Sequence, residues 1–337
     1  MTLLLAADIG GTKSDLAIFE LADSPEAPPL AHQRFLNRQF PDFDAILTDF
    51  LVHAPPPDYA CLGVAAVVRH GEAKLTNLPW KLSEHSLQSK FGWRATCLIN
   101  DLTALCASLP HLQERDLLVI QAGQAEKNGI QAVIAPGTGL GEGFLVSGTS
   151  FFLAKGSEGG HCDFAPLNQE QGELLAYLQK KQPAVSYELL CSGKGIPNIF
   201  DFFSATEVAR DHKRWQDITG SGDQTPLIIE GALADFPCPL CLKTLTTFLD
   251  ILGAEAGNLA LKLYATGGLF IGGGIMPRLA GRISFASFLD SFRRKEKMNE
   301  LMSSFPIHLI LKSDAALWGA FAYGRYHFRE QRGKKRG

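Results

Sequence analysis

Apolar and polar positions follow two different periods along the chain, and these periods alternate. Apolar runs typical of β-strands are separated by segments whose apolar residues recur three or four positions apart, as on one face of a helix. The run at 59–68 is apolar almost throughout, as expected of a strand buried on both faces. Alternation of strands and helices predicts an α/β fold.

The first third of the chain opens on a predicted hairpin. Residues 3–8 and 15–20 read as two strands around a glycine turn. A helix is expected over 83–92, with Ser83 before its first turn and Gly92 at its end. Further strands are predicted at 30–36, 59–68, 71–79 and 95–101, and further helices at 43–54 and 102–110.

After Pro110 the pattern restarts, which indicates a second domain. The length of 337 residues also suggests about two domains. The boundaries expected are a small α/β domain of residues 1–110 plus 312–337 and a large α/β domain of residues 111–311. The large domain has predicted strands at 115–121, within 130–146 on both sides of a glycine turn, at 267–277 and at 305–311, and mainly helices over 170–265. A closing helix at 314–326 is expected to return to the N-terminal strands.

Two glycine turns suggest phosphate binding. Without a Cβ, successive backbone N–H groups at 10–12 and at 137–139 form concavities that suit an anion. Asp8 would repel phosphates unless a cation intervened, so it suits Mg²⁺, directly or through water. Tight hairpins without a ligand are the alternative, and neither a Walker motif nor a strict GxGxxG is present. The glycines at 272–274 could admit a flat adenine ring, or could only allow close packing of a strand on a helix.

Polar side chains that could bind a polyhydroxylated substrate occur in three segments. Asn100 and Asp101 end a predicted buried strand, where ligands of open α/β sheets bind; the alternative for Asp101 is an N-cap. Glu158 and His161 flank two glycines, an arrangement that could grip hydroxyls and that only weakly suggests zinc. Glu188 lies on a predicted helix, where an isolated Glu usually faces solvent. Carboxylates, an amide and an imidazole fix the direction of sugar hydroxyls.

Charge and cysteine content narrow the class of protein. The net charge of −3 gives no reason to expect nucleic acid or an acidic membrane, and the basic residues after 325 read as a solvated end. No apolar run reaches the length of a membrane span. The seven cysteines are scattered, as in a cytoplasmic protein with reduced thiols. Cys238 and Cys241 read as a pair at the start of a helix, with a redox or zinc pair as the alternative.

In order along the chain, the segments ADIGGT, TNLPW, LINDLTAL, APGTGLG, GSEGGHCDFAP, SYELLCSGKGI and GGLFIGGGIMPR together resemble the bacterial glucokinase family of the hexokinase–actin–Hsp70 superfamily. The resemblance spans residues 7 to about 278. It implies two actin-like (ribonuclease H-like) α/β domains with an interdomain active-site cleft. It also implies a cytoplasmic glycolytic enzyme, commonly a homodimer, that uses ATP and Mg²⁺ to phosphorylate glucose at its 6-hydroxyl.

The resemblance carries roles to individual residues. Asp101 matches the catalytic base, and Asp8 would face Mg²⁺ through water. Asn77 resembles a residue that supports the site from behind. The sugar-binding positions are Asn100, Asp101, Gly139, Glu158, His161 and Glu188. The ATP-binding positions are Ala7, Asp8, Ile9, Gly10, Gly11, Thr12, Thr138, Gly139, Gly273 and Gly274.

The chain also departs from the family pattern. Ala7 stands where glycine is usual, and Ala66 and Val67 stand where a Gly-Pro pair is common. These changes could tune sugar affinity or domain closure, so a kinase of another hexose or of an amino sugar stays an alternative to a glucose kinase. A sugar-binding regulator and an actin-like ATPase are the further alternatives. The zinc cysteine cluster of the related repressor and kinase family is missing, which argues against a repressor.

Overall fold

The computed structural model describes residues 1–21, 27–75, 78–148, 152–206, 218 and 222–334, with side chains up to Arg329. The chain folds into two compact units. Unit 1 comprises Met1–Leu117, Gly143–Gly156 and Lys312–Gly337, and unit 2 comprises Leu118–Glu142 and Ser157–Leu311. The predicted domain boundaries after residues 110 and 311 stay a prediction. Asn77 lies outside the described residues.

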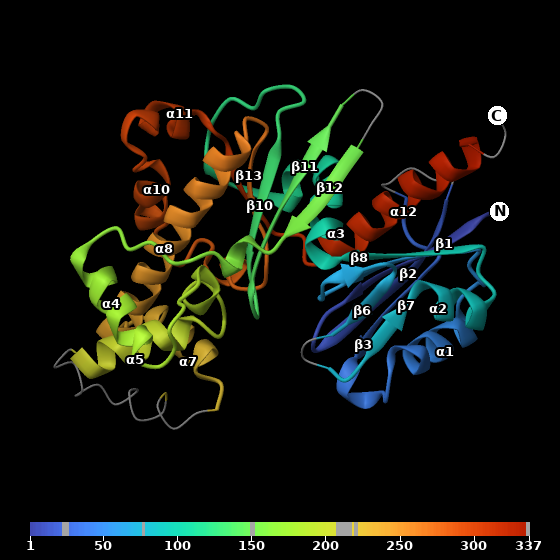
Figure 1. The fold of residues 1–337 in the computed structure, drawn as a ribbon, viewed down its shortest axis with the longest axis horizontal. Helices are drawn as coiled ribbons and strands as arrows, with labels where there is room; N and C mark the ends of the chain where they lie inside the picture. Colours follow the sequence, from blue (N-terminus) through green and yellow to red (C-terminus); the bar gives the residue numbers. More distant parts are fainter. Residues whose placement is uncertain (22–26, 76–77, 149–151, 207–217, 219–221, 335–337) are drawn as a thin grey trace. The chain divides into compact units, whose positions relative to one another are not determined.

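Unit 1 is built on a five-stranded sheet in the order β3-β2-β1-β4-β8 (Figure 1). The first two strands form the predicted hairpin, which is confirmed, and their antiparallel register places Asp8 opposite Asp15. The pairs β1–β4 and β4–β8 are parallel. The strands are β1 Leu3–Ile9, β2 Lys13–Glu20, β3 Ala31–Leu36, β4 Tyr59–Val64 and β8 Ala95–Asn100.

Both faces of this sheet are covered. Along β1, Leu5 and Ile9 belong to the apolar cluster that includes α1, whereas Leu4 belongs to the cluster that includes α12. Period-two alternation of this kind is what a strand between two layers requires. The closing helix packs against β1 and α3, so its predicted return is confirmed (Figure 1). The helices are α1 Phe43–His53, α2 Glu84–Phe91, α3 Asp101–Ser108 and α12 Ala315–Lys334.

Two predicted strands of unit 1 are shorter than expected. Within the run at 59–68, strand β4 ends at Val64. The chain turns there, and Ala66 N–H donates to the carbonyl of Val64. Of the described residues in the run at 71–79, those of β6 form a strand, in the small sheet β5-β6-β7. Gly92 ends α2 in the left-handed conformation with φ of 70°, as predicted. The strands of the small sheet are β5 Val68–Arg69, β6 Glu72–Lys74 and β7 Lys81–Ser83.

A six-stranded sheet, in the order β12-β11-β10-β13-β14-β9, carries the second half of the fold. β10, β13 and β14 are parallel neighbours. The sequence pattern did not predict β12, which carries alternately exposed residues. The strands are β9 Leu117–Gln121, β10 Gln131–Pro136, β11 Leu140–Ser147, β12 Phe152–Ser157, β13 Gly268–Ile271 and β14 Ile307–Ile310.

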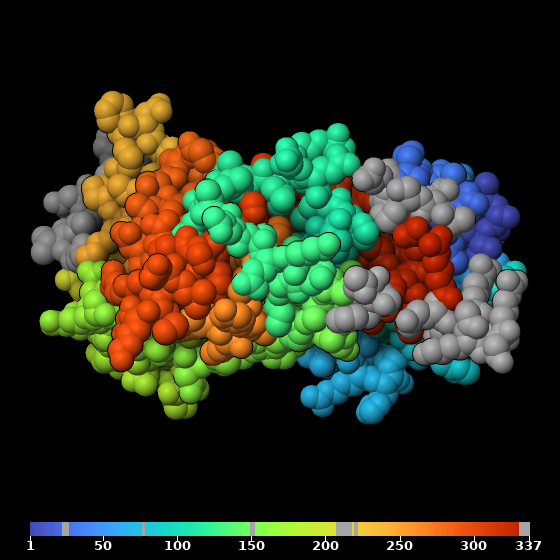
Figure 2. Space-filling view, turned by 90° about the horizontal axis from the view of Figure 1, so that it is seen from above, coloured from blue at the N-terminus to red at the C-terminus, as the bar shows by residue number. Residues whose placement is uncertain are grey.

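The core of unit 2 centres on α8, a 25-residue helix against which α5, α7 and α10 pack (Figure 1). Cys238 is its N-cap residue and Cys241 lies in its first turn, so the predicted helix start is confirmed. α10 and α11 form an outer surface of the unit (orange in Figure 2). The helices are α4 Gln169–Gln179, α5 Ile196–Thr206, α7 Gln224–Ala232, α8 Pro239–Leu263, α9 Met276–Leu279, α10 Ala286–Arg293 and α11 Asn299–Ser304.

Candidate active site

The first glycine turn joins β1 to β2 and is held from beneath by Asn37. This side chain is fully buried, and its Nδ2 donates to the carbonyl of Gly10 at 2.9 Å while its Oδ1 accepts from Ser14 Oγ at 2.8 Å. Its backbone N–H donates to the carbonyl of Thr12 at 3.0 Å. The turn is therefore a braced structure. Sequence reasoning missed Asn37, whose only local signal is a polar residue directly after a strand.

The predicted ATP-binding residues of this turn do not all present side chains. Ala7 and Ile9 are fully buried in β1. Ala7 and Ile9 could therefore contact a ligand only through their backbone groups. Gly10, Gly11 and Thr12 form the turn itself.

Asp8 lies at the end of β1, half-buried beside this turn. Burial, and after it the carboxylate of Asp15 across the hairpin, raise the pKa of Asp8 to about 6, against the opposing charges of Lys13 and Arg34. A divalent cation would stabilise the ionised form, so this carboxylate fits Mg²⁺. Among the described residues no group of three or more His, Cys, Asp or Glu side chains could hold a metal.

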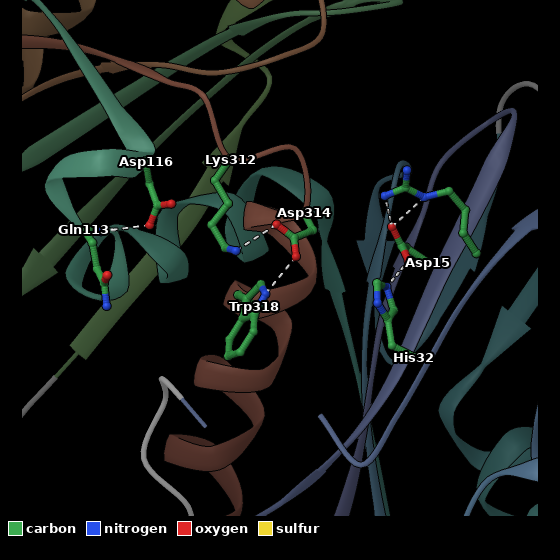
Figure 3. Close-up of polar contacts among 8 residues, drawn as sticks. Asp15, His32, Gln113, Asp116, Lys312, Asp314 and Trp318 are labelled. Carbon is green, nitrogen blue, oxygen red and sulfur yellow. Dashed lines mark hydrogen bonds and ion pairs between the residues drawn. The ribbon is translucent and has the colours of Figure 1, made fainter. Parts of the chain in front are cut away.

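Asp15 is almost fully buried, and a histidine and an arginine of β3 contact it (Figure 3). His32 Nε2 and Asp15 Oδ1 lie 2.6 Å apart, and Arg34 Nε donates to Oδ2 at 2.8 Å. The carboxylate is thus paired on both oxygens. Nothing in the sequence pattern indicated this cluster, because its members come from two strands.

The start of α3 carries the two residues predicted at the end of the buried strand. Asn100 is the N-cap: its Oδ1 accepts from Leu102 N–H at 2.9 Å, and its Nδ2 donates to the carbonyl of Ala66 at 3.2 Å. The alternative that Asp101 is the cap is therefore wrong. Asp101 is the first residue of the helix, and its Oδ1 accepts from Leu102 N–H at 2.9 Å. The helix dipole favours an ionised carboxylate at this place.

Gly156, near the end of β12, packs on the same helix start. Its N–H donates to Thr103 Oγ1 at 2.9 Å, and a Cβ at residue 156 would lie 2.4 Å from Oδ1 of Asn100. Glycine is therefore required here. Glu158 follows two residues later in the chain.

In unit 2 the second glycine turn joins β10 to β11. Gly137 N–H donates to the carbonyl of Gly139 at 2.8 Å, and Gly193 N–H donates to the carbonyl of Gly137 at 2.8 Å. No atom lies within 4 Å of the position that a Cβ of Gly137 would occupy. The turn that contains Thr138 is thus braced on one side and open on the other.

The third glycine cluster follows β13. Gly273 has φ of +80°, and a Cβ there would lie 2.2 Å from the carbonyl oxygen of Pro136 at the end of β10. Gly274 has no atom within 4 Å of its would-be Cβ. Close packing therefore explains Gly273, whereas Gly274 leaves room that a ligand could use.

Glu188 is not on the predicted helix but in a 3₁₀ helix, η5 (Tyr187–Leu189). Its Oε2 accepts from Leu140 N–H at 3.0 Å, and a Cβ at Gly139 would lie 2.4 Å from the same oxygen. The expectation of an isolated solvated Glu is therefore wrong. The carboxylate is fixed against the second glycine turn.

Glu158 and His161 are exposed on a loop that includes the 3₁₀ helix η4 (Gly159–His161). Their Oε2 and Nε2 atoms lie 4.0 Å apart. The loop rests on β11, since a Cβ at Gly160 would lie 2.1 Å from the carbonyl oxygen of Leu140. Loop 158–161 and Glu188 therefore meet at the first residue of β11. The zinc alternative finds no support among the described residues.

Comparison with known proteins identifies the family. The family model described as Glucokinase matches residues 5–327. The chain belongs to the glucokinase family. It is 38% identical to the glucokinase of a Nostoc species over 335 residues, which covers 95% of this chain and 98% of the relative. The crystal structure of a glucokinase from an Antarctic psychrotroph has 32% identity and a TM-score of 0.80, covering 96% of this chain and 99% of that one.

A more distant structure shares the fold alone. The ROK-family glucokinase of Streptomyces griseus, in complex with glucose and AMPPNP, has 19% identity and a TM-score of 0.65, and it covers 96% of this chain and 99% of that one. The predictions of a kinase, a transferase of the glucokinase family, and of two actin-like α/β domains are confirmed. Within the described residues no helix is long and apolar enough for a membrane span.

Proposed function

We propose that this chain transfers the γ-phosphoryl group of ATP to the 6-hydroxyl of glucose, with Asp101 as the base that accepts the hydroxyl proton. Family membership supports the reaction. The observation that carries the role of Asp101 is the arrangement at the start of α3, where Asn100 provides the cap and Asp101 occupies the first helical position. A carboxylate that the helix dipole keeps ionised is suited to accept a proton.

The hydroxyls of the sugar are the ligands proposed for the remaining polar side chains. Asn100 uses one amide hydrogen on Ala66, so the second can bind a hydroxyl. Glu188 keeps acceptor capacity on Oε1, and Glu158 and His161 are exposed. Gly139 contributes by leaving room for Glu188. Planar acceptors in fixed positions give a hexose a single orientation, which phosphoryl transfer requires.

The glycine turns are the proposed ATP site. Backbone N–H groups of 10–12 and of 138–139 would contact phosphates, and 273–274 would lie beside the adenosine. Asp8 would hold Mg²⁺ through water. The ion, when bound, neutralises the charge that develops on the transferred phosphoryl group. Glucose and AMPPNP in the Streptomyces griseus structure support this pair of ligands by analogy.

Kinases of another hexose or of an amino sugar are the main alternative, because Ala7, Ala66 and Val67 depart from the family pattern. A sugar-binding regulator or an actin-like ATPase is less favoured, since Asp8, Asp101 and the loop at 158–161 are present. A homodimer and a cytoplasmic location stay predictions.

The test is ADP release with ATP and Mg²⁺ over a panel of glucose, mannose, fructose, glucosamine and 6-deoxyglucose. Glucose should give the highest kcat/KM, and 6-deoxyglucose should give none, because it lacks the accepting hydroxyl. Higher kcat/KM for another sugar would assign that sugar. ADP release that does not depend on sugar would support an ATPase instead.

A further inference from the structure

β11 carries a buried carboxylate that the proposed reaction does not use. Glu142 is only 3% exposed. No described residue forms a hydrogen bond with its Oε1. An unpartnered polar atom in an apolar interior is costly, so its presence calls for an explanation in structure or function.

Loop 158–161 lies directly on this carboxylate. A Cβ at residue 159 would be 1.9 Å from Oε2 of Glu142, so only glycine fits between the carboxylate and the loop. Glu158 precedes this glycine and His161 follows two residues after it. The position of both proposed sugar ligands therefore depends on what lies at residue 142.

A second buried carboxylate supports the other sugar ligand. Glu255 of α8 is 1% exposed, and its Oε2 accepts from Asn258 Nδ2 at 2.8 Å. The hydroxyl of Tyr187 accepts from the same Asn258 Nδ2 at 3.3 Å. Lys295 Nζ donates to Asn258 Oδ1 at 2.6 Å. Tyr187 is the residue before Glu188, so this network anchors η5.

The two loops are also paired with each other. Tyr187 N–H donates to the carbonyl of Cys162 at 3.0 Å, and Phe164 N–H donates to the carbonyl of Val185 at 2.8 Å. They consequently form one layer, supported by Glu142 under η4 and by Glu255 under η5. Displacement of either support would move both sets of sugar ligands.

We propose that Glu142 is a positioning residue for the hexose ligands, and that it seats the paired loops firmly when protonated and loosens them when ionised. The inference rests on the proposed function, since it assigns glucose to Glu158, His161 and Glu188. The inference adds that the affinity for sugar depends on pH, although Glu142 itself does not contact the sugar.

The charges around Glu142 agree with this direction. Burial, and after it the charge of Glu255, raise the pKa of Glu142 to about 7, against the opposing charge of Lys262. Burial is the largest cause that raises the pKa of Cys191, and the charges of Glu255 and Glu142 raise it too, so this thiol stays neutral. Tyr187 also stays neutral, because burial and Glu255 raise its pKa. Ionisation of Glu142 thus places a negative charge near Glu255 and against Gly159 of loop 158–161.

The test is the KM for glucose from about pH 6 to about pH 8.5, a range that spans the titration of Glu142. In the wild type the KM should rise roughly five- to tenfold with pH, the lower range of coupling between sites, while kcat changes little. E142Q imitates the protonated carboxylate. It should keep the low KM across the whole range. A wild-type KM that is flat, or a slope that persists in E142Q, would overturn the inference.

Two further variants separate the interpretations. Glu142→Ala should raise the KM for glucose at every pH, because the support is lost rather than neutralised, and calorimetric titration with glucose should give the same ratio. Asp250→Asn, on the same helix as Glu255 but bonded to Gln171 and Ser291, is the matched control and should leave the KM unchanged.

If Glu158→Gln leaves glucose affinity intact, the proposed sugar site itself is wrong. If it weakens affinity while E142Q keeps the slope, only the role of Glu142 is wrong.

Discussion

Two buried carboxylates, one in each unit, have opposite surroundings. Asp15 of unit 1 is 4% exposed and Glu142 of unit 2 is 3% exposed. Asp15 has a histidine on one oxygen and an arginine on the other (Figure 3). Glu142 has another carboxylate, Glu255, as a charged neighbour, and the charge of Lys262 opposes the effect of Glu255 on its pKa.

The difference shows that the charged neighbours of a buried carboxylate, rather than its degree of burial, decide which protonation state is favoured. A carboxylate that is hydrogen-bonded to an arginine is retained for its charge, and one beside a like charge is retained for its protonated form. Asp101 belongs with the first kind, because the N-terminus of α3 favours its charge. Exchange of a carboxylate for the amide of the same shape should therefore be severe at Asp101, moderate at Asp15 and harmless at Glu142.

The largest effect is expected at the proposed base. Asp101→Asn should lower kcat at least about 100-fold, because an amide cannot accept the hydroxyl proton and a positioned base contributes roughly that factor or more. The measurement is ADP release at saturating glucose and ATP. Asp116→Asn changes a carboxylate of unit 1 that accepts from Gln113 N–H at 3.0 Å in a capping box; it is the matched control and should keep its kcat (Figure 3). Retention of more than about a tenth of kcat by Asp101→Asn would refute the base assignment.

The second effect is on stability against pH. The folded-state pKa of Glu142, about 7, lies above the unfolded value of 4.5, so its contribution is full below the unfolded value and is lost as the pH rises through the folded one. At alkaline pH this loss amounts to up to about 3 kcal/mol. Glu142→Gln should remove it and raise the free energy of unfolding at about pH 8.5. Urea unfolding at about pH 6 and at about pH 8.5 measures the free energy of unfolding of the wild type and of Glu142→Gln. The same change with pH in both proteins would contradict the prediction.

A smaller loss is expected when the paired carboxylate is neutralised. Asp15→Asn should destabilise the folded state by about 1–2 kcal/mol, because both charged hydrogen bonds weaken while the half-exposed His32 and Arg34 remain solvated. Added salt should reduce the difference. If thermal unfolding showed that Asp15→Asn is as stable as the wild type, the hydrogen-bond partners of Asp15 would not set it apart from Glu142.

The smallest effect concerns the nucleotide. Gly274→Val fills space in which no protein atom lies within 4 Å of the new Cβ, so the fold should tolerate it. The KM for ATP should nevertheless rise about tenfold, because the side chain would exclude the adenosine from the backbone, whereas the KM for glucose should not change. Gly172→Ala, an equally open glycine on α4, controls for the loss of glycine. An unchanged KM for ATP would remove 273–274 from the nucleotide site.

Local signals predicted most of the elements. The hairpin at Asp8, the end of α2 at Gly92 and the start of α8 at Cys238 follow from alternation, from a left-handed glycine and from proline at a helix start. These features depend on neighbours in sequence. The same local rules assigned Glu188 to a helix and to solvent, and both assignments are wrong because a backbone N–H 48 residues away binds it.

The buried polar partners could not be predicted in this way. Asn37 braces a turn 27 residues earlier in the chain. Glu255 lies in a long amphipathic helix, where a single Glu usually faces solvent. Its burial follows only once Tyr187 and Asn258 are packed around it. Local sequence reveals turns and periods, whereas the satisfaction of a buried polar group is settled by segments that meet only in the folded chain.

The most direct test of Asp101 as a base separates binding from chemistry. Calorimetric titration of Asp101→Asn with glucose, in the absence of ATP, reports the affinity without turnover. We expect a Kd within about threefold of the wild-type value, since the asparagine keeps the shape and one acceptor of the carboxylate. A Kd raised by about the same 100-fold factor that kcat loses would show that Asp101 holds the sugar rather than accepting its proton.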